Sequence, residues 1–219
     1  MFDDRLANRL AKLDSCSVSD ANDLLGIKGA VIGIHAAWPC GKISGRVVTI
    51  KLASKGSRQP ARHLGTAAIE AASPGNIIVV DHRGRCDVAG WGGLLSLAAK
   101  KRGVDGVIID GACRDVDDSR EVDFPVYARA TVPVTARGRI VEHSFNEVVD
   151  VRGISVQPND LVIADGSGVV FIPAARAEEV VAQAETLAAR EAEMAKAVTA
   201  GHSIAEVMGG NYESMLERS

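Results

Sequence analysis

The sequence predicts one domain of the mixed α/β class over residues 1–219. Two continuous apolar runs, at residues 77–81 (IIVVD) and 106–110 (GVIID), are typical of strands covered on both faces, and each ends in an acid. Residues 92–101 between them have a helical pattern, which predicts parallel strands joined by a right-handed crossover. Beyond Thr131, short strands separated by turns indicate hairpins, so the sheets are expected to be mixed.

The N-terminal segment predicts two short helices. Residues 2–13 place apolar side chains at helical spacing. Residues 17–25 (SVSDANDLL) predict a second helix with Ser19 as its N-cap. Asp20 and Asp23 are interpreted as charges that favour the helix dipole rather than as ligands.

The remaining elements before Thr131 are assigned from apolar runs and turn residues. We expect a loop with an edge strand at residues 26–40, a strand at 45–52, a helix at 62–72, a turn at 73–76 and a further strand at 124–129. Pro125 suits a position near the beginning of that last strand. Asp81 and His82 are expected at the carboxyl end of a buried strand.

The C-terminal third predicts two hairpins and a long helix. Strands are expected at residues 148–151, 153–156, 161–164 and 169–172, and the helix at about 174–199. One face of this helix carries Val180, Ala184, Leu187, Glu191, Met194 and Val198. This seam predicts a helix that packs along its whole length, and Glu191 places a carboxylate within it.

Composition excludes several functional classes. The formal net charge of -3 gives no general attraction to nucleic acid or to a membrane surface. The four cysteines lack metal-ligand spacing and are expected to be reduced thiols, and the N-terminal residues have no signal-peptide pattern, so a cytoplasmic protein is predicted. Zinc spacing, a GxSxG elbow, a Walker phosphate loop and a GxGxxG fingerprint are all missing from the sequence.

The stretch 91–118 is the strongest candidate for a site. A guanidinium at Arg114 suits a carboxylate ligand, and Asp115 next to it is a hard oxygen ligand for Mg²⁺ or Mn²⁺. Together they would bind a small α-keto acid and its metal, or else form a pair that caps the next helix. Gly92 and Gly93 could leave backbone amides available for a carboxylate, or could serve tight packing of helix on strand.

The spacing within this stretch resembles a known family. Gly93, twenty residues, Arg114-Asp115, two residues and Asp118 are similar to the Gly-x20-Arg-Asp-x2-Glu/Asp signature of the class II 4-hydroxy-4-methyl-2-oxoglutarate/4-carboxy-4-hydroxy-2-oxoadipate aldolases. These are related to the regulator of ribonuclease activity A (RraA). Similar blocks recur over residues 74–76, RGVDGVIIDG and 156–173, so the resemblance covers roughly residues 17–190.

The resemblance implies a fold and an assembly. The fold is an RraA-like layered α/β/β/α sandwich with mixed sheets and a long C-terminal helix. The assembly is a homotrimer or homohexamer in which that helix, at about 174–199, makes a subunit contact.

The resemblance also implies roles for particular residues. Arg114 would hold the pyruvyl group, and the backbone of Gly92, Gly93, Leu94 and Leu95 would receive the substrate carboxylate. Asp115 would anchor the divalent metal, with Asp118 supporting it. Glu191 of a neighbouring subunit, or alternatively Glu193, would complete the catalytic set.

The implied function is a divalent-metal-dependent class II pyruvate aldolase, a carbon–carbon lyase. It would cleave a 4-hydroxy-2-oxo acid such as 4-hydroxy-4-methyl-2-oxoglutarate to pyruvate and would decarboxylate oxaloacetate as a side activity. Family aldolases often carry an acid where Gly93 stands, and its absence here is expected to weaken the aldol cleavage more than the decarboxylation. The alternative is a non-catalytic RraA-like regulator that binds a ribonuclease. Regulators typically lack the acid after the arginine, so Asp115 favours the enzyme.

Overall fold

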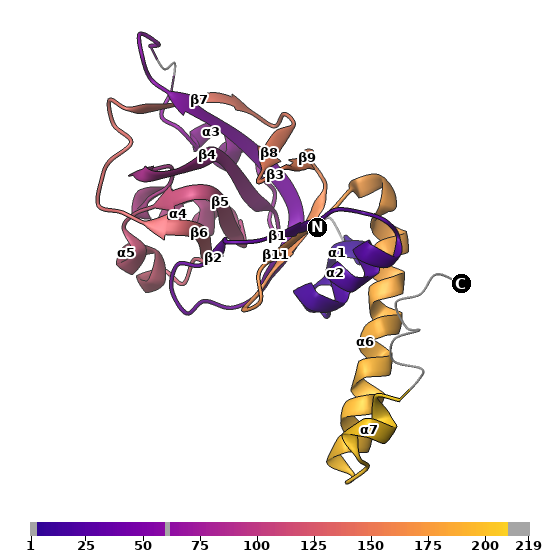
Figure 1. Cartoon of the computed structure of the whole chain (residues 1–219). Helices are drawn as coiled ribbons and strands as arrows, with labels where there is room; N and C mark the ends of the chain where they lie inside the picture. The colour runs from indigo at the N-terminus through magenta and orange to yellow at the C-terminus, as the bar shows by residue number, and fades with distance from the viewer. Residues whose placement is uncertain (1–3, 60–61, 210–219) are drawn as a thin grey trace.

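The computed structural model describes residues 4–59 and 62–209, and it arranges them in four layers (Figure 1). The strands are β1 (Ala30–Val31), β2 (His35–Ala36), β3 (Ile43–Ser54), β4 (Ile77–Ala89), β5 (Gly106–Cys113), β6 (Val126–Thr131), β7 (Ile140–Phe145), β8 (Val149–Val151), β9 (Ile154–Val156), β10 (Leu161–Ala164) and β11 (Val169–Ile172). The helices are α1 (Arg5–Leu10), α2 (Ser15–Leu24), α3 (Thr66–Ala71), α4 (Gly93–Arg102), α5 (Val116–Glu121), the 3-10 turn η1 (Ala174–Arg176), α6 (Ala177–Thr199) and α7 (Ile204–Val207).

A mixed sheet forms the centre of the molecule. Its main path runs β1-β11-β10-β3-β4-β5-β6-β2, with β7 paired to β3, and β8 and β9 form a separate hairpin. The strands β3 to β6 are parallel to one another, whereas β10 and β11 join them in antiparallel fashion. The predicted crossover from β4 through α4 to parallel β5, and both predicted hairpins, are therefore confirmed.

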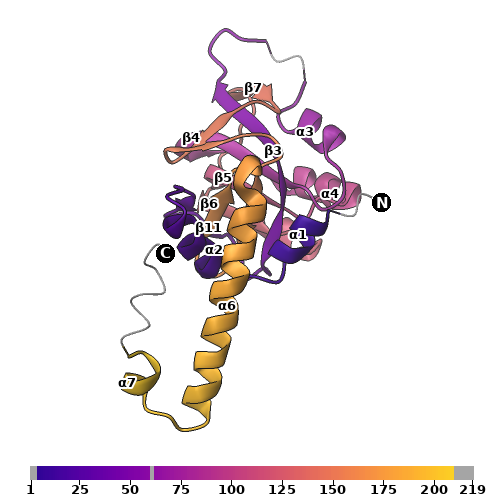
Figure 2. The ribbon, with the colours of Figure 1, turned by 90° about the vertical axis from the view of Figure 1, so that its right-hand side faces the viewer.

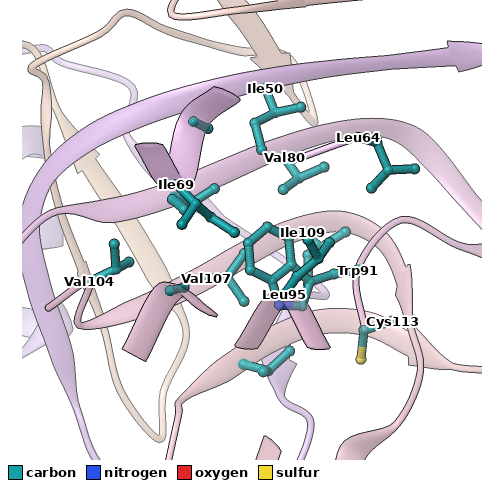
Figure 3. Packing of buried hydrophobic residues seen from close by; sticks show 14 of the residues in the cluster. Ile50, Leu64, Ile69, Val80, Trp91, Leu95, Val104, Val107, Ile109 and Cys113 are labelled. Atoms are coloured by element: carbon teal, nitrogen blue, oxygen red, sulfur yellow. The ribbon is translucent and has the colours of Figure 1, made fainter. Parts of the chain in front are cut away.

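Three hydrophobic cores separate the four layers. One face of β3 to β6 packs against α3 and α4 through residues such as Ile69, Trp91 and Leu95 (Figure 3). The opposite face packs against β10 and β11, and the outer face of that pair packs against α1, α2 and α6. The expected α/β/β/α sandwich is thus built from alternating faces of buried strands.

The strand β4 extends well beyond its predicted end at Asp81. Regular pairing of β4 with β5 stops at Val80, and pairing resumes only at Arg85 and Ala89. Arg83 and Gly84 in this irregular part both have positive φ angles, which bend the strand. Asp81 and His82 consequently lie at the end of the regular ladder rather than at the end of the strand. This extension of β4 delivers the chain to the start of α4.

The N-cap predicted for α2 is wrong. The helix begins at Ser15, and the cap is Asp14, whose side chain accepts a hydrogen bond from the Ser17 amide. Ser19 lies inside the helix. A distant carboxylate favours Asp14 over Ser19 as the cap. Asp165 accepts hydrogen bonds from both the amide and the hydroxyl of Ser15 at 2.7 Å, and this holds Ser15 at the first position of the helix. The strand β7 and the short helix α7 were not predicted either, and Phe2 of the first predicted helix lies outside the described residues.

The long C-terminal helix α6 projects well beyond the sandwich (Figure 2). Its buried residues end at Leu187, whereas Glu191 is exposed and Val198 is 43% exposed. Packing along the whole helix is therefore wrong for a single chain, because among the described residues α6 has no buried side chain beyond Leu187. Among the described residues, no helix combines the length and the apolar character needed to cross a membrane.

Candidate active site

The start of α4 and the end of β5 are fastened together by two backbone hydrogen bonds. The Gly90 amide donates to the Ala112 carbonyl at 2.8 Å, and the Arg114 amide donates to the Trp91 carbonyl at 3.0 Å. Segments that are about twenty residues apart in sequence therefore lie side by side. The predicted meeting of the glycine turn with Arg114 and Asp115 is present in the structure.

Asp115 occupies the N-cap position of α5 in a left-handed conformation, with φ 53° and ψ 45°. Its side chain makes no capping bond. Instead its Oδ2 accepts a hydrogen bond from the Gly93 amide at 3.2 Å and lies 3.2 Å from Arg114 Nε. The carboxylate is thus turned back toward α4, and the reading of Arg114 and Asp115 as a simple helix cap does not hold.

Gly92 and Gly93 make room for two carboxylates. A Cβ atom at Gly92 would lie 2.8 Å from Asp115 Oδ2. A Cβ atom at Gly93 would lie 2.6 Å from both the Cβ and the Oδ2 of Asp118. A Cβ at position 92 would displace the Asp115 carboxylate from its present place, and a Cβ at position 93 would collide with the Asp118 Cβ, which cannot turn away. The two glycines therefore form a cradle for these carboxylates. Both acids therefore lie over consecutive residues at the start of one helix.

The amides at the start of α4 are only partly available. Gly93 donates to Asp115, and Leu95 donates to the Gly92 carbonyl. The amides of Gly92 and Leu94 make no hydrogen bond within residues 4–59 and 62–209. Of the four backbone amides predicted to bind the substrate carboxylate, these two are therefore available. The Leu94 side chain is 79% exposed beside them.

A pocket of about 610 Å³ opens beside this cradle. Its floor is the apolar core beneath α3 and α4, including Leu64, Ile69, Trp91 and Leu95, several of which are seen in Figure 3. Arg114 and Asp115 line one part, whereas Asp118 is not among the lining residues. The pocket is larger than a three-carbon acid needs, so it has room for a second part of a substrate.

Polar residues that the sequence analysis did not identify also line the pocket. They are His63, Thr66, Glu70, Thr135 and Arg137. His63 Nδ1 lies 2.9 Å from the Leu64 carbonyl and donates this hydrogen bond, because a carbonyl oxygen can only accept. Arg137 has no carboxylate within 4.0 Å in the described part of the chain. Thr66 and Glu70 lie on α3, and His63, Thr135 and Arg137 lie on loops, so no single local pattern marks the group.

Cys113 immediately precedes Arg114 but is not a candidate nucleophile. The residue is buried, and burial raises the pKa of its thiol to about 11. A protonated thiol is a weak nucleophile at neutral pH. The chemistry of the site therefore depends on the arginine, the carboxylates and the backbone amides.

The C-terminal acids lie elsewhere. Glu191 is on α6, in the helical layer opposite to α4 (Figure 1). Although Glu191 is exposed, some loss of hydration and then the nearby negative charges of Asp14 and Asp20 raise the pKa of its carboxyl. Glu193 is bound to Lys196 at 2.6 Å. Within one chain neither acid reaches Arg114, so a catalytic part for either requires a second copy and stays a prediction.

The donor set fits a hydrated divalent cation. No group of three or more His, Cys, Asp or Glu residues that could enclose a metal occurs within residues 4–59 and 62–209. Mg²⁺, however, commonly binds through one or two carboxylates and keeps several waters. Asp115 and Asp118 over the glycine cradle supply such an open set.

The fold and this site define an RraA-like protein. Residues 15–171 match the family described as RraA-like, Aldolase/RraA, and the chain belongs to that family. The protein DlpA of Legionella pneumophila is 28% identical over 92% of this chain and 33% of its own length. A protein of Halalkalibacterium halodurans named "Putative 4-hydroxy-4-methyl-2-oxoglutarate aldolase" is 34% identical over 54% of this chain and 56% of its own length. The chain thus spans well under two thirds of these two relatives.

Solved structures give the same family. An uncharacterized protein from Pseudomonas syringae pv. tomato superposes with a TM-score of 0.84 at 29% identity, covering 94% of this chain and 97% of its own. RraAS2 of Streptomyces coelicolor, described as an unusual member of the RNase ES inhibitor RraA family, gives a TM-score of 0.74 at 26% identity, covering 84% and 93%. The predicted fold and family are confirmed.

Proposed function

We propose that this protein is a divalent-metal-dependent pyruvate aldolase that cleaves a 4-hydroxy-2-oxo dicarboxylic acid to pyruvate and a second keto acid. The observation that carries the proposal is the juxtaposition of Arg114, Asp115 and the unbonded amides of Gly92 and Leu94 beside one pocket. A guanidinium, backbone donors and a carboxylate are the groups that binding and activating an α-keto acid requires.

The carboxylate and keto oxygen of the pyruvyl half would be held by Arg114 and the α4 amides. Removal of the C4 hydroxyl proton, relayed through water to a carboxylate of the site, forms the new carbonyl as the C3–C4 bond breaks. The electron pair of that bond passes to the C2 oxygen, and Arg114 stabilises the enolate charge. Protonation at C3 completes pyruvate. Mg²⁺ or Mn²⁺, held by Asp115 with Asp118 beside it, would supply further positive charge to polarise the keto group.

The second half of the substrate would lie against the apolar floor of the pocket. Arg137 lines the same pocket and has no acidic partner within the described residues, so it is suited to a second carboxylate. His63 offers Nε2 nearby. Our proposal that the substrate is a dicarboxylic acid rests on the positive charge of Arg137.

Oxaloacetate decarboxylation would use the same groups. The C3–C4 bond breaks with loss of CO₂, and the same enolate forms without any hydroxyl proton to remove. This reaction makes the smaller demand on a proton relay, so we expect it even if the glycine at position 93 slows aldol cleavage.

The alternative function is a regulator that binds a ribonuclease. It is favoured by the similarity to RraAS2, whose family is described as RNase ES inhibitors. Asp115 favours the enzyme, because its carboxylate is held beside Arg114 rather than used as a helix cap. A pull-down that recovered a ribonuclease, together with no lyase activity under any divalent metal, would support the regulator.

The proposal also includes an assembly of three or six copies. The outer half of α6 and the short α7 carry Val198, Ile204 and Met208, which are 43%, 58% and 42% exposed. A second copy packed there would cover apolar surface that a single chain leaves in water. It could also bring Glu191 toward another subunit's site.

The decisive experiment is a lactate-dehydrogenase-coupled assay of pyruvate release. The panel would hold several 4-hydroxy-2-oxo acids and oxaloacetate, each with Mg²⁺, Mn²⁺ or EDTA. We expect metal-dependent release that Arg114→Ala and Asp115→Ala abolish. Arg120→Ala is the matched control, because Arg120 is exposed on α5 and pairs with Asp117 away from the pocket. Full metal-dependent activity in either site variant would show that the assignment is wrong.

A further inference from the structure

Two buried serine hydroxyls lie directly beneath the site. Ser96 on α4 and Ser119 on α5 are each 0% exposed, and their Oγ atoms are 2.8 Å apart. A hydroxyl in an apolar interface is unfavourable unless its hydrogen bonds are made. The pair joins the helix that carries the glycine cradle to the helix that Asp115 begins.

The direction of the first hydrogen bond follows from its donor, and the bond lengths assign the others. Trp91 Nε1 can only donate, and it donates to Ser96 Oγ at 3.0 Å. Either serine can donate in the 2.8 Å bond between the hydroxyls: Ser96 as donor leaves Ser119 its 3.3 Å bond to the Asp115 carbonyl, whereas Ser119 as donor leaves Ser96 its 3.5 Å bond to the Gly92 carbonyl. The arrangement with Ser96 as donor has the shorter bonds and is the better one. Ser119 in turn donates to the Asp115 carbonyl at 3.3 Å. The chain therefore runs from the indole to the backbone of Asp115.

This hydrogen-bond chain ends at a residue whose backbone conformation is unfavourable. Asp115 has a positive φ angle of 53°, which non-glycine residues seldom adopt. Its carbonyl accepts from both the amide of Ser119, at 3.2 Å, and the Ser119 hydroxyl. The left-handed conformation is what turns the Asp115 side chain toward the Gly93 amide and Arg114. Ser96 also contacts Gly92, so one pair of hydroxyls touches both halves of the site.

We propose that Ser96 and Ser119 are positioning residues that hold Asp115 in its left-handed conformation over the glycine cradle. The importance of that position for catalysis rests on the proposed lyase function. The hydrogen-bond chain itself does not, and it can be tested without any substrate.

The polarity of the chain predicts different effects for the two alanine variants. In Ser119→Ala, Ser96 can still accept from Trp91 and can donate to the Gly92 carbonyl, so only the Asp115 end loses a bond. In Ser96→Ala, the buried indole N–H loses its acceptor, whereas Ser119 keeps its bond to Asp115. Ser119→Ala should therefore affect the site more, and Ser96→Ala should lower the melting temperature more.

The test begins with hydrogen–deuterium exchange at the Gly93 amide, which Asp115 Oδ2 protects in the native chain. We expect exchange at this amide at least tenfold faster in Ser119→Ala, with a smaller change in Ser96→Ala. Ser17→Ala is the matched control, because Ser17 is a buried serine, 1% exposed, whose hydroxyl binds Asp14 far from the site. Its melting temperature should fall while Gly93 exchange is unchanged.

Pyruvate release is then measured on the same three variants. The expected result is a loss of at least tenfold in kcat/KM for Ser119→Ala, with a higher Mn²⁺ concentration needed for half-maximal rate. Unchanged Gly93 exchange in Ser119→Ala would overturn the positioning role. Faster exchange with unchanged kinetics would overturn its importance for catalysis. If exchange is faster in Ser119→Ala but the native protein releases no pyruvate, the positioning role stands and the proposed function is refuted.

Discussion

The side chain of Asp118 fills the space that a side chain at position 93 would need. A Cβ atom on Gly93 would lie 2.6 Å from both the Cβ and the Oδ2 of Asp118. Because Asp118 Cβ is fixed to the backbone of α5, turning the carboxylate away would not relieve the contact. The acid at position 118 therefore requires a glycine at position 93. The Asp118 carboxylate occupies the space into which the side chain of an acid at position 93 would project.

Gly93→Ala should destabilise the protein by about 1–3 kcal/mol, as overpacking of a tight contact usually does. Denaturant unfolding would measure it. Gly166→Ala is the control, since a Cβ at Gly166 meets no atom within 4 Å. In an Asp118→Gly background the effect of Gly93→Ala should shrink, because the contact is gone. Equal losses in both backgrounds would contradict the proposed contact.

Arg137→Gln should impair dicarboxylic substrates selectively. Loss of a charge-assisted hydrogen bond corresponds to roughly a tenfold or greater rise in KM. Activity on a monocarboxylic analogue such as 4-hydroxy-2-oxopentanoate should be unchanged. Arg139→Gln is the control, because Arg139 binds the Thr135 carbonyl and does not line the pocket. If both substrates suffer alike, Arg137 does not recognise the second carboxylate.

His82 should make stability depend on pH. It is 1% exposed, and burial lowers the pKa of its imidazole below the ordinary value of 6.5. Between the folded and unfolded pKa values only the unfolded chain takes up the proton, so stability should fall as pH drops below about 6.5. Thermal unfolding across pH 5 to 8 would show this. His82→Asn should flatten the profile, whereas His143→Gln, at an exposed histidine of β7, should leave it unchanged.

The outer half of α6 should be buried in the assembled protein. Analytical ultracentrifugation is expected to give the mass of three or six copies. Val198→Glu should reduce that mass, because a charge in an apolar contact is unfavourable. Lys196→Gln, at an exposed position two residues away on the same helix, should not. A native monomer would refute the assembly and with it any part for Glu191 in catalysis.

Much of the central fold could be predicted because its signals are local. The runs at 77–80 and 106–109 are apolar on both faces, and α4 ends where Gly103 adopts a positive φ angle of 83°. The N-cap of α2 could not be predicted, since Asp14 and Ser19 are both good capping residues. The contact that favours Asp14 comes from Asp165, which is 150 residues away from Ser15 in the sequence. The strand β7 was missed because it holds the polar pair Glu142-His143 and depends on β3 for pairing.

The candidate site divides in the same way. The order of glycine turn, helix and buried strand predicted that the glycine turn and Arg114-Asp115 would meet, because parallel strands present their carboxyl ends at one edge. Spacing could not show that Asp115 would bind the Gly93 amide or that Asp118 would occupy the space over Gly93. His63 and Arg137 enter the pocket from loops whose positions depend on tertiary packing.

The strand β3 is used by both β-layers at once. Residues 43–46 pair with β10, residues 47–51 pair with β4, and residues 50–54 pair with β7. The two layers therefore depend on consecutive parts of one strand, and loss of either layer leaves that strand paired over only part of its length. We infer that the sandwich unfolds as one cooperative unit, as a single domain would. The slowest-exchanging amides of β4 and β10 should then report a common free energy of opening.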